Sequence, residues 1–358
     1  MELNSLQAAA IAYIEQYAGE RAGQASVILE QVREMSDISR DKFDCAMDRI
    51  KANACVALHF HPDRVNRDNL TVVASLLHDG VYKNQFDTYL SNGRLAPDPE
   101  GPRAIWESNM FGQHYKTNAV ENADRPKYGS LDLMRLADGP SPRFGSCYFI
   151  LDAAVSRRCT FTYLDSYQSP AEKGTLTVFE DIMASLMAEC FERQYALGVK
   201  DITPDQLIER LCGRLSQPYA DPSGKELYGN LDHYIEAQVH GRISLQDDVL
   251  MLAADPSFRE EEVGAHIKQL CEKYGIRLFW HAGFRLDVSD VPANFRGAAM
   301  PSLARRIARE GRIDPFVIGK AARQLKLHPE EWVDRGSYEH CLQELKLLWH
   351  VLVKFGRG

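Results

Sequence analysis

The chain has 358 residues, 45% of them hydrophobic and 26% charged, which suits a soluble globular protein of one large or two ordinary domains. Its formal net charge of −8 argues against a general nucleic-acid or membrane-surface binder, although it leaves room for a local basic groove. The N-terminus lacks a basic segment followed by an apolar run, and no stretch reaches the roughly 18–20 apolar residues of a membrane span. None of the eight cysteines forms a Cys-x-x-Cys. We therefore expect a cytoplasmic protein with reduced thiols and no membrane partner.

The N-terminal region, residues 1–50, is predicted to be a helical cap. Apolar residues within 5–35 recur at helical spacing, and Gly19 and Gly23 suggest a break between two helices there. Ser39 is suited to begin a further helix, which would run to about Ile50. This region contains no residue pattern that indicates a chemistry.

The first strong strand candidate covers residues 54–60, and it ends in the polar segment His59–Arg64 (HFHPDR). Pro62 cannot continue a ladder of hydrogen bonds, so polar groups gather where the strand ends, as they do in many sites. His59 and His61 share one face of the strand. They could be a pair of metal ligands with Asp79 as a nearby third, hydrogen-bonded structural histidines, or part of a nucleotide site. In the nucleotide site, Arg64 would grip a phosphate.

Two later segments share a pattern of basic residue, aromatic residue, glycine and hydroxyl. They are Lys127–Ser130 and Arg143–Ser146. Glycine lets a ligand approach the backbone, and an aromatic ring can stack on a flat ring. Each segment could equally be a strand entry with a tight turn, because neither matches a phosphate-loop or dinucleotide fingerprint.

The stretch Tyr234–Gly241 alternates bulky apolar residues with polar ones, which predicts a strand. Glu236, Gln238 and His240 would share one face of it. Burying such side chains without partners is costly, so this face either lines a cleft or lies exposed on the sheet.

The remaining elements complete a chain with no repeat and no obvious linker. We expect a core over 51–256 and a helical C-terminal region over 257–358 packed on that core. The predictions in detail are a turn at 91–93, a short helix over 105–115, strands over 147–151 and 158–163, helices over 176–197 and 204–215, a helix from about 244 to 254, helices over 259–274, 301–310, 314–326 and 337–354, and a short strand over 276–280.

Four motifs together carry a family resemblance: His59–Arg64, Arg125–Leu131 (RPKYGSL), Ser141–Ser146 (SPRFGS) and Glu236–Gly241 (EAQVHG). They resemble a bacterial protein family of unknown function and, through it, ADP-ribosyltransferases of toxin and phage-defence systems. Thr160–Ser166 and Ser244–Asp248 extend the resemblance, which covers roughly residues 55–260. It implies an α+β fold with an ADP-ribosyltransferase-like split β core, wrapped by N- and C-terminal helices, that holds NAD+ in a cleft.

The resemblance also implies roles for individual residues. Glu236 would be the catalytic carboxylate. In the transferase pattern, two acidic or amide residues lie two positions apart and the catalytic glutamate is the second of them. This chain has Gln238 at that second position, so Glu236 and Gln238 are both candidates. NAD+ would be a substrate, and no metal would be required. The resemblance implies that His59 or His61, with Arg64, binds the phosphates and that Ser130 or Ser146 binds the ribose. Tyr128 (beside Gly129) or Phe144 would stack on nicotinamide.

The implied function is transfer of ADP-ribose from NAD+ to a macromolecular acceptor, with RNA favoured and protein next. As a toxin-type enzyme in phage defence or a toxin–antitoxin system, it would have an antitoxin partner. Two other functions remain open on the sequence: a metal-dependent hydrolase that uses His59, His61 and Asp79, and a non-catalytic binding protein.

Overall fold

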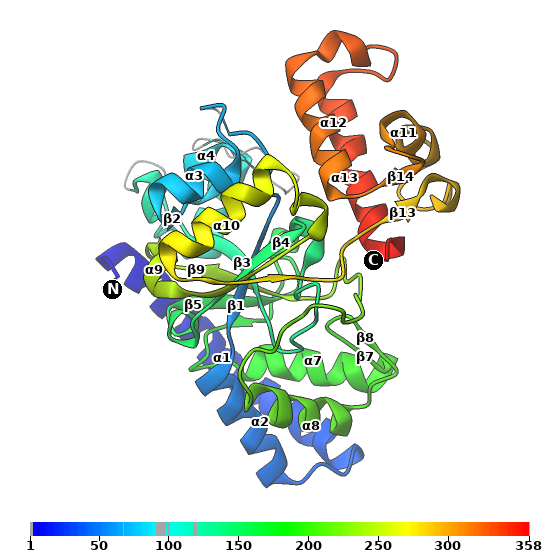
Figure 1. Ribbon diagram of the computed structural model, residues 1–358. Helices are drawn as coiled ribbons and strands as arrows, with labels where there is room; N and C mark the ends of the chain where they lie inside the picture. The colour runs from blue at the N-terminus through cyan, green and yellow to red at the C-terminus, as the bar shows by residue number, and fades with distance from the viewer. Residues whose placement is uncertain (1–2, 67, 91–97, 99–100, 117–119, 358) are drawn as a thin grey trace.

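The protein has an α+β fold built on a large, mostly antiparallel sheet, as a computed structural model shows (Figure 1). The structure describes residues 3–357 except 67, 91–97, 99–100 and 117–119, so the turn expected at 91–93 lies outside the described residues. The strands of the main sheet run in the order β12-β11-β4-β1-β3-β9-β5-β6, and only β11 and β12 are parallel. Their bounds are Val56–Phe60 (β1), Lys127–Leu131 (β3), Cys147–Leu151 (β4), Cys159–Tyr163 (β5), Lys173–Gly174 (β6), Ile235–Val239 (β9), Val249–Ala254 (β11) and Arg277–Trp280 (β12). Short pairs join β2 (Val81–Tyr82) to β10 (Ile243–Ser244), β7 (Tyr195–Ala196) to β8 (Val199–Lys200), and β13 (Leu286–Asp287) to β14 (Arg312–Ile313).

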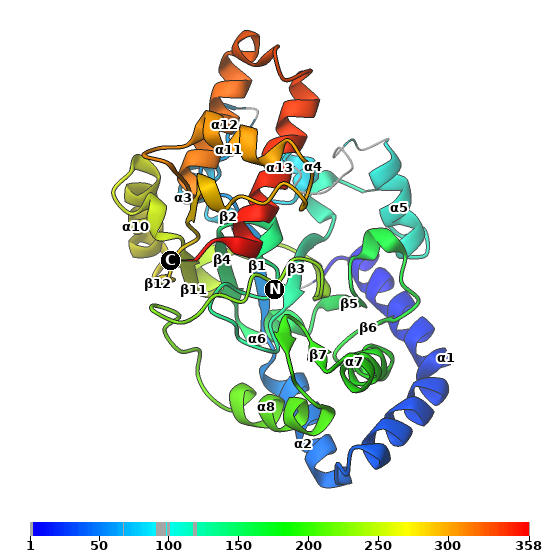
Figure 2. The ribbon, with the colours of Figure 1, turned by 90° about the vertical axis from the view of Figure 1, so that its right-hand side faces the viewer.

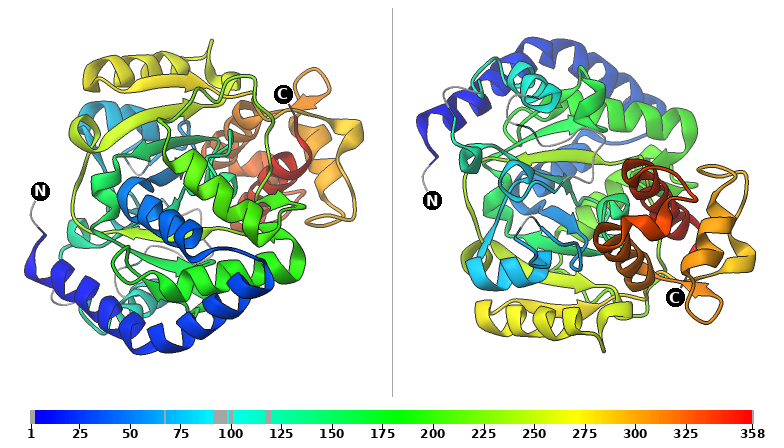
Figure 3. Two further views of the ribbon diagram at one scale, coloured as in Figure 1. Left: turned by 90° about the horizontal axis from the view of Figure 1, so that it is seen from below. Right: turned by 90° about the horizontal axis from the view of Figure 1, so that it is seen from above.

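Helices cover both faces of the sheet (Figures 1 and 3). On one side α1 packs along α7 and α2 along α8, while α10 packs on α3 on the other side. The bounds are Ser5–Met35 (α1), Arg40–Asn53 (α2), Val72–Asp79 (α3), Gln85–Thr88 (α4), Pro102–Met110 (α5), Ala153–Ser156 (α6), Glu180–Arg193 (α7), Pro204–Leu215 (α8), Leu245–Asp248 (α9), Glu262–Tyr274 (α10), Met300–Ile307 (α11), Pro315–Leu327 (α12) and Tyr338–Phe355 (α13).

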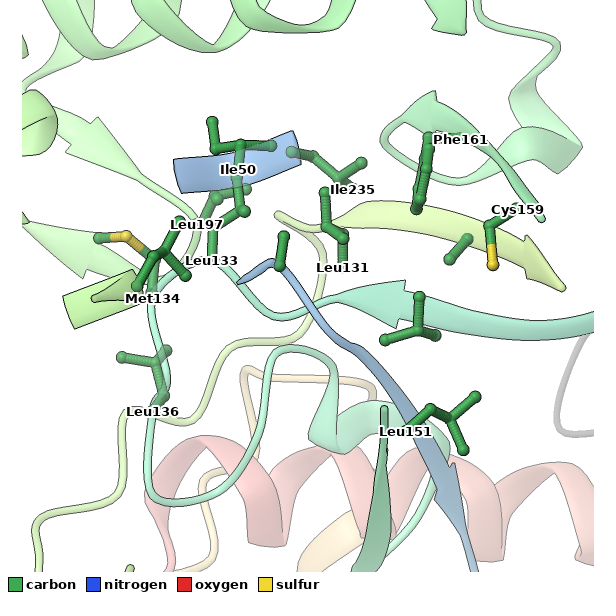
Figure 4. Close-up of a cluster of buried hydrophobic side chains, with 14 of the residues drawn as sticks. Ile50, Leu131, Leu133, Met134, Leu136, Leu151, Cys159, Phe161, Leu197 and Ile235 are labelled. Atoms are coloured by element: carbon green, nitrogen blue, oxygen red, sulfur yellow. The ribbon is translucent and has the colours of Figure 1, made fainter. Parts of the chain in front are cut away.

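The main hydrophobic core lies where these helices meet the sheet. Figure 4 shows side chains of α2, β3 and β9 in one cluster, among them Ile50, Leu131 and Ile235, which are almost fully buried. Burying one such aliphatic side chain stabilises a fold by about 1.5–3 kcal/mol. The strands that carry the candidate site are therefore held from behind by close packing.

The sheet is split between β1 and β3. These strands pair only through Val56↔Leu131 and Ala57↔Ser130, at the beginning of β1. Beyond that point, residues 58–60 of β1 pair with β4 alone, and residues 127–129 of β3 pair with β9 alone. Gly129 stands where the two strands separate, and a Cβ atom there would lie 2.5 Å from the carbonyl oxygen of Ala57. The absence of a side chain at this position therefore lets the backbones approach before they diverge.

Many expectations from the sequence are confirmed, and two are wrong. The helix over 204–215 and the strand over 147–151 have the bounds expected, and Ser39 caps α2. The break expected near Gly19 and Gly23 does not occur, because α1 is continuous and both glycines sit where an added Cβ would touch nothing. The helix expected to reach residue 254 ends at Asp248, and residues 249–254 form strand β11 between β4 and β12. A short apolar run is ambiguous until its partners are known.

The last helices form a cluster of their own, in orange and red in Figure 2. Trp332, Leu345 and Trp349 belong to this second hydrophobic cluster, whereas β12, also C-terminal to residue 256, is a strand of the main sheet. α13 is tied to the core through the indole N–H of Trp349, which donates to the carbonyl oxygens of Pro142 (3.1 Å) and Arg143 (3.0 Å). None of the helices that the structure describes combines the length and apolarity needed to cross a bilayer.

Candidate functional site

A cavity of about 930 Å³ opens where the sheet splits. Its walls come from the end of β1 and the segment after it, from β3 and β9, from the short helices η3 (Pro142–Phe144) and η4 (Ser166–Gln168), and from α5 and α13. This volume lies at the upper end of the range typical of sites for small molecules and cofactors, about 300–1,000 Å³. The split in the sheet thus creates room for a ligand of nucleotide size.

Glu236 lines this cavity from the middle of β9. Its residue is only 7% exposed, and its Oε1 accepts hydrogen bonds from the Ser166 hydroxyl and from Nε2 of Gln238 (3.0 Å). Burial raises the pKa of Glu236 to about 7, and the nearby Asp165 carboxylate adds to the rise, while the two hydrogen bonds oppose it. The carboxyl group is thus fixed in position and able to change charge near neutral pH.

Gln238 lies behind Glu236 and outside the cavity lining. It is fully buried, and its Oε1 accepts a hydrogen bond of 2.8 Å from the Thr160 hydroxyl. Thr160 also contacts Nε2 of His240 (3.1 Å), whose Nδ1 contacts the Tyr115 hydroxyl (2.7 Å). The polar face predicted for β9 is therefore a buried network, and within it Glu236 is the residue that reaches the cavity.

Aromatic and cationic side chains stand near Glu236. Tyr128 and Trp106 line the cavity with ring centres 5.9 Å apart, and the Arg103 guanidinium lies 5.4 Å from the Tyr128 ring centre. The Tyr128 hydroxyl donates to Glu107 (2.7 Å), which also forms a fully buried ion pair with Arg125 (2.7 Å). Gly129 lines the same wall. Trp106 and Arg103, which the sequence did not single out, come from α5.

Ser141 and Ser166 are the serines beside Glu236 and His59 that line the cavity. Neither Ser130 nor Ser146 lines it: the Ser130 hydroxyl donates to that of Ser141 (2.7 Å), and the Ser146 hydroxyl is buried with no hydrogen-bond partner in the described structure. Ser166 ends the Thr160–Ser166 motif, so the sequence did contain a signal for it. Phe144 does line the cavity and packs edge-on against Tyr234, with 5.5 Å between ring centres.

His59, in β1, and His61, just after it, both line the cavity but differ in surroundings. His59 Nδ1 donates to the carbonyl oxygen of Gly145 (3.1 Å), and its Nε2 accepts the Ser141 N–H (3.4 Å). Burial lowers the pKa of His59 to about 3, which keeps the ring neutral. His61 packs edge-on against Trp349, and burial followed by the charge of Arg64 lowers its pKa. Within the described residues, no three His, Cys, Asp or Glu side chains are grouped to hold a metal ion.

The cavity is cationic although the chain is acidic. Seven lysine or arginine residues and three carboxylate residues line it within the described part of the chain, an excess of four positive charges on a protein of net charge −8. Arg64 is one of the seven. The positions that pattern reading missed are Lys83, Arg103, Arg296 and Lys346, because isolated basic residues carry no spacing signal. Such a concentration of charge favours an anionic ligand.

Comparison with known proteins adds a family but no activity. No curated protein matches the chain. Residues 55–355 match the family described as "Protein of unknown function (DUF3626)", so the match spans the main sheet, the cavity and the C-terminal helices. The chain belongs to the DUF3626 family.

Proposed function

We propose that the protein is an ADP-ribosyltransferase that moves ADP-ribose from NAD+ to a macromolecular acceptor. One observation carries this proposal: the Glu236 carboxyl group, held by Ser166 and Gln238, faces a cationic cavity of nucleotide size. The sheet that separates between β1 and β3 supports an ADP-ribosyltransferase-like split core. The family resemblance of the motifs that border the cavity adds to this support.

The chemistry is a substitution at the anomeric carbon of the nicotinamide ribose. The bond from C1′ to the nicotinamide nitrogen breaks, and its electron pair leaves with neutral nicotinamide. Positive charge then develops on C1′ and the ring oxygen, as in glycoside hydrolysis. An oxygen or nitrogen atom of the acceptor forms the new bond to C1′ and releases its proton. Glu236 in its ionised form stabilises the developing charge and accepts a hydrogen bond from the ribose 2′-hydroxyl.

Other cavity residues have roles that suit this substrate. Tyr128 and Phe144 offer aromatic surfaces for the nicotinamide ring, and Arg64 offers a guanidinium for the phosphates. Gln238 acts through Glu236 as a positioning residue, because it does not reach the cavity.

The acceptor is proposed to be RNA, with protein as the next candidate. The cationic lining supports a polyanionic acceptor near the reacting carbon. An enzyme of this kind, acting in phage defence or as a toxin, would be neutralised in its host by an antitoxin protein.

The experiment that tests this proposal uses NAD+ labelled in its adenylate half. The wild-type protein is incubated with labelled NAD+ and cell extract, and the products are digested with ribonuclease or protease to show which polymer carries the label. We expect Glu236→Gln to lower turnover by at least about a hundredfold, as loss of a principal electrostatic stabiliser does. Glu330→Gln, which removes a carboxylate whose side chain is 70% exposed, is the matched control. Absence of both transfer and nicotinamide release from the wild type would refute the proposal.

A further inference from the structure

Part of the cavity wall is supplied by α13, a helix that begins 99 residues after the end of β9. Lys346 and His350 lie one turn apart on this helix and line the cavity together with Arg64, which follows β1. The indole hydrogen bonds of Trp349 to the backbone of Pro142 and Arg143 fix α13 against the core at this point. The position of these side chains is thus set by buried contacts.

Lys346 is held in an environment that disfavours its charge. Burial, followed by repulsion from the Arg64 guanidinium, lowers the pKa of Lys346 to about 8. No carboxylate of the described residues forms an ion pair with it. Two other arginines at this wall, Arg143 and Arg296, share Asp232 at 2.7 and 3.4 Å. Burial and a neighbouring cation thus disfavour the positive charge of Lys346, and no ion pair among the described residues offsets them.

His350 supplies an unsatisfied polar atom beside this lysine. Its Nδ1 is buried and has no hydrogen-bond partner in the described structure. Burial, followed by the charges of Arg143, Arg296 and Lys346, lowers the pKa of His350 to about 3, so the ring is neutral at pH 7 and carries one N–H. With its one N–H on Nδ1, the ring would donate to a ligand oxygen, which recovers the free energy lost by leaving that buried atom without a partner.

The carboxylate next to Arg64 in the sequence does not line the large cavity. Asp63 precedes Arg64, but its side chain packs against Gly319 of α12, where an added Cβ would lie 1.5 Å from Asp63 Oδ2. Asp63 lines a small adjoining cavity, which Arg64, Lys346 and His350 also border, and not the large one. On the side of the large cavity, no carboxylate of the described residues forms an ion pair with Lys346, so the space beside it is open to an anion from outside the chain.

We propose that Lys346 and His350 of α13, together with Arg64, form a subsite for the diphosphate of a nucleotide ligand. A diphosphate would relieve the repulsion between the two cations, and its oxygens would accept hydrogen bonds from the ammonium group and the imidazole N–H. The subsite rests on the proposed function in that NAD+ carries such a diphosphate between its riboses. It makes the C-terminal helices a part of the substrate site.

The test measures binding of ADP and of adenosine by isothermal titration calorimetry, which needs no turnover. We expect Lys346→Gln to weaken the binding of ADP at least about tenfold. The affinity for adenosine should not change, because adenosine has no phosphates. Lys354→Gln removes an exposed lysine of the same helix and serves as the control. Lys346→Met covers the risk of misfolding: it should unfold at a higher temperature than the wild type without ligand and gain less stability from ADP. Absence of ADP binding to the wild type, or equal ADP affinity in Lys346→Gln, would overturn the subsite.

The result also separates the subsite from the proposed function. If ADP binding depends on Lys346 and persists in Glu236→Gln, the subsite is supported even when NAD+ is not consumed. In that case only the proposed reaction is refuted. If the protein consumes NAD+ but its affinity for ADP is the same in the wild type and in Lys346→Gln, the subsite is overturned and the proposed reaction is retained.

Discussion

Replacing Glu236 by Gln should change how the stability of the protein depends on pH. Burial and Asp165 raise the pKa of Glu236 from an ordinary 4.5 to about 7. As the pH rises from about 4.5, Glu236 ionises in the unfolded chain before it ionises in the folded protein. The free energy of unfolding therefore falls until the pH passes about 7. The stabilising contribution is thus complete in acid and lost in mild base.

The size of the effect follows from the shift. The rise in the pKa of Glu236 corresponds to roughly 3 kcal/mol in total, most of which falls between about pH 5 and about pH 9. Gln at position 236 keeps an oxygen that can accept the hydrogen bonds from Ser166 and Gln238, yet it never ionises. The variant should therefore retain the local structure and become more stable than the wild type as the pH rises.

Urea unfolding of both proteins at a series of pH values would measure this difference. We expect the free energy of unfolding of Glu236→Gln minus that of the wild type to increase by roughly 2–3 kcal/mol between about pH 5 and about pH 9, with most of the change below about pH 7. Glu330→Gln controls for loss of a carboxylate at the surface. Parallel curves for the wild type and Glu236→Gln would refute the reasoning, since Glu236 would then ionise alike in the folded and unfolded states.

Three further substitutions test the surroundings of the site. Gln238→Ala should lower kcat for NAD+ by about tenfold or more with little change in KM, because it releases Glu236 without touching the substrate; a KM effect alone would contradict this positioning role. Arg125→Met should lower the free energy of unfolding in urea by about 3–5 kcal/mol, since it leaves the buried Glu107 carboxylate without its cation; a loss below about 1 kcal/mol would show that the pair contributes little. Gly129→Ala should cost about 1–3 kcal/mol in the same assay because its Cβ meets the Ala57 carbonyl oxygen, and an unchanged midpoint would mean that the strands can separate freely.

Local patterns in the sequence identified elements whose signals lie within a few residues. Pro204 at the first turn of α8 and the capping box at Thr203 mark the beginning of that helix, and the apolar alternation of 234–240 marks β9. The apolar run 249–254 was misread as helix, because its strand state depends on β4 and β12, which lie far away in the sequence.

The candidate site was only partly accessible to such reading. Motifs pointed to Glu236, Tyr128 and Phe144 and to His59, His61 and Arg64, and all of these line the cavity. Sequence reasoning could not tell Glu236 from Gln238, because both lie on one face of the same strand. The network from Thr160 that holds Gln238 in the interior separates the two.

The amino-acid sequence by itself determined the composition of a globular protein, most of the longer helices, several strands, and the motifs around the split in the sheet. Only the tertiary structure decided which hydroxyl meets Glu236 and which cations share its cavity. Ser166 lies 70 residues before Glu236, and Trp349 contacts a carbonyl oxygen 207 residues before it. Contacts over such separations leave no local periodicity, since they arise from the packing of whole elements, and α13 therefore enters the site without any signal in its sequence.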